Sequence, residues 1–317
     1  MGSPASKLHK NCRMTTVPNV TFKLQVRTAA TCHLCNSLSQ YLVFAQEPLF
    51  SSPDDVVAGP NFSLLKDATL RPCVTVIGSA PYVESTIEQA KMNIGLIFDV
   101  ADACNLNYID FHLDYNLDPS SEPLIYEVIS QWKSRYGRNS SSSQGLDSES
   151  TCPRITIGHA TRLQLFTQTQ WRDLVEAISG LPITFVGLPQ SDMFMQGRAF
   201  KDMPLGAPRG TLRVPYIAKN YGLEIAMSVN NVENAFTPQG SLDPLSLCTF
   251  GVAVFQTATP EDIRTLVVGR LFTICLSYFY FGLFPSIPFC SYLGYWNILI
   301  LYLPEISDLD LQECHRC

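Results

Sequence analysis

Seven short apolar runs, most of them followed by a polar break and a helical pattern, limit most strongly how this chain can fold. Strands that alternate with helices in this way favour a parallel sheet with helical connections. The candidate strands span 21–29, 40–46, 73–80, 108–114, 154–160, 183–189 and 223–231.

Helix-start signals lie between these runs. Ser85 and Glu88 have the spacing of a capping box ahead of an amphipathic stretch. Thr167 and Gln170 repeat that spacing before a second helical pattern. Apolar residues at helical spacing also fill 123–137, which ends in a glycine, as many helices do.

Polar residues collect where the candidate strands end. In a closed parallel barrel, functional groups lie at the carboxyl ends of the strands. The sequence therefore predicts an α/β protein with a parallel (β/α)8 TIM-type barrel and a polar mouth. The residues at these ends are Gln46, His112, Asp114, His159, Gln190, Asp192, Asn230 and Asn231.

Composition narrows the class of protein. Of the 317 residues 46% are apolar, which is enough for a large core, and the net charge of −6 argues against a nucleic-acid partner. Eleven cysteines at irregular spacing are typical of reduced cysteines in a cytoplasmic protein. Residues 1–20 contain no apolar signal segment, and we expect them to be disordered.

Two segments do not fit the barrel pattern. The serine-rich stretch 137–151 reads as a flexible surface insertion. The apolar C-terminal segment 266–317 contains no charged residue or histidine from 271 to 304, and two prolines interrupt it. Three interpretations stand for it: a non-native C-terminus, a membrane anchor through 271–303, or a buried helix pair.

Several motifs resemble the cytosine-deaminase-like branch of the amidohydrolase superfamily, whose members are metal-dependent (β/α)8 hydrolases of C–N bonds in small cyclic molecules. The matching stretches cover 21 to about 260, in the order that the family has them. They are "QVRT", "LVFAQEPLFS", "IDFHLDYNLD", "ITIGHAT", "ITFVGLPQSDMFMQGR" and "GLEIAMSVNNVENAFTPQGSLDPLSL". The resemblance implies a barrel domain over 21–265 and a small cyclic nitrogen-containing ligand.

The resemblance also implies roles for single residues. His112 takes the position of a metal ligand after the fifth strand, and His159 that of the histidine that polarises water and substrate. Gln46 takes the position of a substrate-binding glutamine, and Phe236 that of an aromatic residue over the ring.

Three departures from the family pattern bear on function. The H-x-H pair of the first strand is absent, so the barrel is expected to be incomplete, with that strand missing. Tyr115 replaces the proton-shuttling glutamate, and Asn230, or alternatively Asn231, replaces the aspartate that serves as metal ligand and base. Asp192 is a candidate substitute acid beside the substrate.

These departures leave two functions open. The first is a metal-dependent hydrolase or deaminase of cyclic amidines or amides such as cytosine, with His159, Asn230 and Tyr115 as catalytic residues. His112 and Asn230 would then hold zinc or iron, and we expect that binding to be weak. The second is an inactive, vestigial or ligand-binding barrel with a decayed metal site, which the segment 271–303 could tether to a membrane. The nearby Asp114 and Asp118 are interpreted as helix-capping and loop carboxylates.

Overall fold

The computed structural model describes residues 23–27, 40–72, 74–137, 152–232, 235–240, 243–268, 271–272 and 300–302. The expected N-terminal segment 1–20, nearly all of the insertion 137–151 and most of the C-terminal segment 266–317 lie outside these residues.

A six-stranded parallel sheet, β2 to β7, organises the fold, and its strands are neighbours in the order in which they occur in the chain. This confirms the predicted α/β architecture, and the arrangement is consistent with part of a TIM-type barrel. The strands are β1 (Lys23–Arg27), β2 (Gln40–Ala45), β3 (Val74–Ser79), β4 (Tyr108–Leu113), β5 (Arg154–His159), β6 (Ile183–Gly187), β7 (Ile225–Ser228), β8 (Leu271–Phe272) and β9 (Ile300–Tyr302).

The first strand differs from expectation. The run at 21–29 is expected to join the sheet in parallel, but β1 pairs antiparallel with β2, with Lys23 opposite Phe44. Alternation of apolar residues specifies a strand but carries no information on its direction. At the far edge β9 pairs antiparallel with β7, so both edges of the parallel sheet are occupied. The missing first barrel strand stays a prediction.

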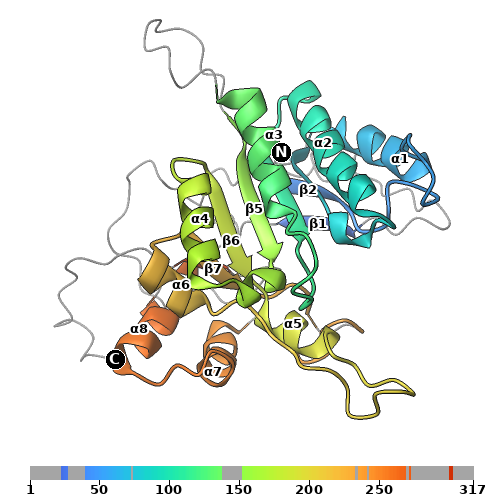
Figure 1. Ribbon diagram of the computed structural model, residues 1–317. Coiled ribbons are helices and arrows are strands. Elements are labelled where there is room, and N and C mark those ends of the chain that lie inside the picture. The colour runs from blue at the N-terminus through green and yellow to red at the C-terminus, as the bar shows by residue number, and fades with distance from the viewer. Residues whose placement is uncertain are drawn as a thin grey trace, which may run out of the picture.

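Helices follow most of the parallel strands. Figure 1 shows α2, α3 and α4 lying along one side of the sheet, with α1 at the β2 end and α6 at the β7 end. The helices are α1 (Pro60–Thr69), α2 (Ile87–Ala103), α3 (Ile125–Tyr136), α4 (Gln168–Ile178), α5 (Pro189–Met195), α6 (Val214–Tyr221), α7 (Pro244–Val254) and α8 (Pro260–Val268), with short 3₁₀ turns η3 (Pro81–Val83) and η5 (Thr161–Leu165).

One of the two predicted capping boxes is confirmed. The Thr167 hydroxyl accepts a hydrogen bond from the Gln170 backbone amide, and the Gln170 side-chain oxygen accepts one from the Thr167 backbone amide. The box at Ser85 is wrong by one residue. Thr86 caps α2 instead, accepting from the Gln89 amide at 3.1 Å.

The sheet is buried on both faces, as parallel sheets usually are. In β4, Ile109, Phe111 and Leu113 belong to the main core shared with the helices. Alternation turns Tyr108 and His112 to the other face, where Tyr108 packs against a smaller cluster that includes Phe44. This inner face leads to the carboxyl ends of the strands, where the candidate site lies.

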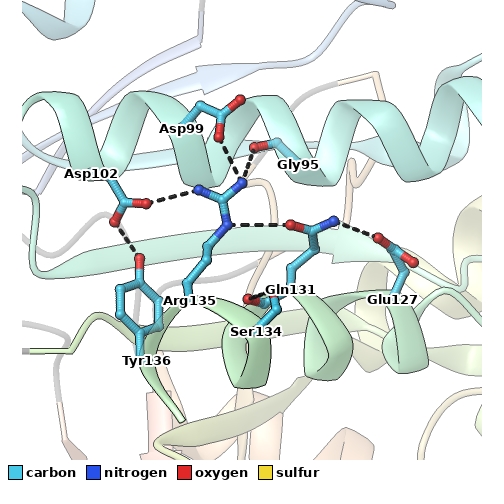
Figure 2. Close-up of polar contacts among 8 residues, drawn as sticks. All are labelled: Gly95, Asp99, Asp102, Glu127, Gln131, Ser134, Arg135 and Tyr136. Carbon is cyan, nitrogen blue, oxygen red and sulfur yellow. Dashed lines mark hydrogen bonds and ion pairs between the residues drawn. The ribbon is translucent and has the colours of Figure 1, made fainter. Parts of the chain in front are cut away.

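An ion-pair network joins the outer surfaces of α2 and α3 (Figure 2). Arg135 on α3 contacts Asp99 at 2.6 Å and Asp102 at 2.8 Å, both on α2. Tyr136 hydrogen-bonds the other oxygen of Asp102, and Gln131 accepts from Arg135. The network fixes the contact between two helices that cover the sheet.

Two further features bear on the sequence predictions. Among the described residues, Cys104 and Cys248 are free cysteines. Within the described ranges, no helix has both the length and the apolar character that a membrane crossing requires. Nearly all of the stretch 271–303 lies outside those ranges.

Candidate functional site

His112 reaches the inner face because two glycines leave room for rings there. It lies opposite Gly158 in the β4–β5 register, and a methyl group at Gly158 would approach the His112 Cδ2 atom to 2.7 Å. Gly78 on β3 likewise leaves space for the ring of Phe44, whose centre lies 4.8 Å from that of His112. The small residues on β3 and β5 therefore position the imidazole of β4.

His159 ends β5 in a left-handed conformation, with φ of 66°. Such a conformation is uncommon for a residue other than glycine and is often found at functional sites. It brings the imidazole over the inner face, where its ring centre lies 4.9 Å from that of His112, with the two planes nearly perpendicular. The structure thus brings together the two histidines that the sequence places at strand ends.

Asp192 orients His159 from α5. Its Oδ1 atom lies 2.7 Å from His159 Nδ1, and its Oδ2 atom accepts a hydrogen bond of 2.6 Å from the Thr211 hydroxyl. Both partners of the first contact are buried, with 2% and 0% of their side chains exposed. Burial raises the pKa of Asp192 well above its ordinary value. The contact holds one proton, and which partner carries it depends on the histidine tautomer.

Aromatic rings complete this part of the site. Tyr115 packs on His159 with 4.3 Å between ring centres, and Tyr82 lies 5.3 Å from Tyr115. Gln46 hydrogen-bonds the Tyr82 hydroxyl, so the predicted glutamine also belongs here. We call Phe44, Tyr82, His112, Tyr115 and His159 the ring cluster.

One residue after β7 is connected to this cluster through a neighbour of Asp192. The Asn230 amide donates a 3.3 Å hydrogen bond to the hydroxyl of Ser191, which precedes Asp192 on α5. Asn231 is buried, whereas Phe236 is about half exposed. The structure therefore connects Asn230 to the support of His159, and it leaves the predicted substrate contacts of Asn231 and Phe236 as proposals.

The two carboxylates that follow His112 have structural roles, as predicted. Asp114 caps α3, accepting hydrogen bonds from the amides of Leu124 at 2.7 Å and Ile125 at 3.1 Å. Burial raises the pKa of Asp114 to about 7, against the effect of those two hydrogen bonds and of Arg162. Asp118 accepts from the backbone and hydroxyl of Ser120 in the loop.

The donors of the site do not fit a metal centre within the part of the chain that the structure describes. No three His, Cys, Asp or Glu side chains come together there in a group that could hold an ion. Two possible metal ligands, His112 and His159, do lie close together, but the Nδ1 atom of His159 contacts Asp192. Three protein ligands are the usual minimum for a catalytic zinc site.

Sequence reasoning missed two members of the site. Tyr82 follows the end of β3, so applying the strand-end rule to every strand would have found it. Thr211 carries no such signal, because it precedes a helix and reaches Asp192 only through the tertiary fold.

Comparison with known proteins gives the fold alone. No protein-family profile matches the chain, and no curated protein matches its sequence. Two crystal structures of 5-methylcytosine deaminase from Klebsiella pneumoniae are similar in fold. The one with 5-fluorocytosine is 18% identical with a TM-score of 0.54, and the one with phosphonocytosine is 17% identical with a TM-score of 0.55. Each alignment covers 75% of this chain and 49% of the deaminase chain, so this chain spans about half the length of that protein.

Proposed function

We propose that this chain binds a small, planar, nitrogen-containing ring, such as a cyclic amidine or amide of the cytosine type, in the ring cluster. The observation that carries the proposal is the perpendicular pair of His112 and His159, with Asp192 behind His159. Imidazole and phenol side chains offer aromatic faces and polar edges together, which suits a flat polar ligand. The fold likeness to a deaminase crystallised with cytosine analogues supports the same ligand class.

We propose further that this binding needs no metal. The described residues offer two imidazoles as metal ligands. Asn230 supplies no anionic ligand, because its side chain is an uncharged amide, which donates a hydrogen bond to Ser191. Neither zinc nor iron forms a tight site with so few donors and no negative charge. Weak binding of a divalent metal therefore remains our expectation for this chain.

Hydrolysis of a C–N bond in such a ring is the second candidate, and the contact between His159 and Asp192 favours it. His159 would accept a proton from the attacking water, and Asp192 would stabilise the resulting imidazolium. The leaving nitrogen must then gain a proton. Burial raises the pKa of Tyr115 above its ordinary value, which makes its hydroxyl a poor proton donor.

We expect slow hydrolysis of such a ring at best. A missing acid–base group typically costs about 10²- to 10⁴-fold in rate. Tyr115 and Asn230 replace two carboxylates that the family resemblance implies. We therefore expect the chain to bind such rings but to hydrolyse them very slowly.

The test is calorimetric titration of the purified full chain with cytosine, 5-methylcytosine and uracil, in buffer with and without a chelator. Ammonia release from the same rings is measured in parallel. We expect binding that the chelator does not change, and little ammonia. Binding that disappears with the chelator, or rapid ammonia release that depends on metal, would contradict the proposal.

A further inference from the structure

The hydroxyl group of Tyr115 is buried and has no hydrogen-bond partner within the described residues. A buried polar group without a partner destabilises the folded chain and calls for an explanation. Tyr82, whose ring lies 5.3 Å from that of Tyr115, provides a contrast, because its hydroxyl is hydrogen-bonded by Gln46.

The position of Tyr115 ties this unsatisfied group to the candidate site. Its ring packs on His159, and it belongs to the loop that directly follows β4, three residues after His112. Two other buried polar atoms without partners in the described chain lie at the carboxyl ends of β6 and β7, in the same parallel sheet. They are the Gln190 side-chain oxygen at the start of α5 and the Ser228 hydroxyl at the end of β7.

The Tyr115 hydroxyl is also a donor at neutral pH. Burial, followed by the charge of Asp192, raises the pKa of Tyr115, so the phenol keeps its proton. A protonated phenol offers its hydrogen to an acceptor on a ligand.

We infer that the Tyr115 hydroxyl recognises the ligand by donating a hydrogen bond to a carbonyl oxygen or an unprotonated ring nitrogen at the edge of the bound ring. The inference rests on the proposed function and names the chemistry that this site selects. Rings that carry such an acceptor bind well, and rings of equal size without one bind weakly. Tyr115 thus determines specificity through contact with the ligand.

The experiment compares Tyr115→Phe with Tyr82→Phe, since each change removes one hydroxyl and keeps the ring. Without ligand, Tyr115→Phe should raise the melting temperature by about 2 °C, because an unpaired buried group is removed. Tyr82→Phe should lower it by about 2 °C, because a hydrogen bond is lost. In titrations with the tightest ring among cytosine, 5-methylcytosine and uracil, Tyr115→Phe should bind about 3- to 10-fold more weakly.

Aniline serves as the ring without a carbonyl or ring-nitrogen acceptor, and its weak binding should be the same in the wild type and in Tyr115→Phe. A Tyr115→Phe protein that is less stable than the wild type, or that binds the carbonyl-bearing ring equally tightly, would overturn the inference and leave the proposed function standing. A wild-type chain that binds none of the three rings would overturn both.

Discussion

Replacing Gly158 by alanine tests how the fold positions His112. The added methyl group would lie 2.7 Å from His112 Cδ2 and 3.0 Å from Nε2, closer than carbon atoms tolerate. Gly158 does not adopt a left-handed conformation, so alanine fits the backbone and the clash with the ring is the main effect. The imidazole must therefore rotate away from Phe44 and His159.

The size of the effect follows from two opposing terms. Overpacking of a core typically costs about 1–3 kcal/mol. Replacing glycine by alanine lowers the entropy of the unfolded chain and returns about 0.4–1 kcal/mol. We expect a net loss of about 1–2 kcal/mol in the free energy of unfolding, together with weaker ring binding, because the displaced imidazole no longer faces the ligand.

Urea denaturation followed by circular dichroism measures the stability, and Gly95→Ala is the matched control. A methyl group at Gly95 in α2 would meet only Gln131 at 3.8 Å, an ordinary contact. That variant should gain up to about 1 kcal/mol from helix propensity. If Gly158→Ala is as stable as Gly95→Ala and binds the ring as the wild type does, His112 is not positioned in the way described.

Two further predictions concern the electrostatics of the fold. Arg135→Met should cost less than about 1 kcal/mol, and the loss should shrink in 1 M NaCl, since Asp99 and Asp102 remain well exposed to water; a loss of several kcal/mol that salt does not change would contradict this. The pKa of Asp114 is about 7 in the folded chain and near 3.9 when unfolded, so its stabilising contribution is present below pH 4 and is lost as the pH rises to about 7. The wild type should therefore lose up to about 4 kcal/mol more than Asp114→Asn between pH 4 and pH 8 in urea denaturation, and equal losses would refute the assignment.

Local sequence patterns predicted most of the sheet. β2 to β7 lie within the predicted runs because short apolar segments bounded by polar breaks favour buried strands over helices, which need longer segments. The direction of β1 was not predictable, since pairing direction depends on the chain around it. The stretch at Ser85 contains two overlapping boxes, Ser85 with Glu88 and Thr86 with Gln89, and the local pattern cannot choose between them.

The site was predictable in part for a similar reason. Strand ends gave Gln46, His112 and His159, because the carboxyl ends of parallel strands meet at one edge. Asp192 was also among these candidates, but its contact with His159 was not predictable, since Asp192 lies 33 residues away and reaches the histidine from a short helix. Whether a buried hydroxyl finds a partner, as at Tyr82 but not at Tyr115, depends on packing that no local pattern encodes.

Binding of a ring at the histidine pair without metal is the central claim, and NMR observes it most directly. The chain is stripped of metal, titrated with cytosine, and followed through the imidazole C–H signals, with His112→Gln and His159→Gln used to assign them. We predict saturable shifts of both signals in the presence of a chelator, because the two rings lie 4.9 Å apart at one site. Signals that stay unchanged with cytosine until zinc is added would contradict the account.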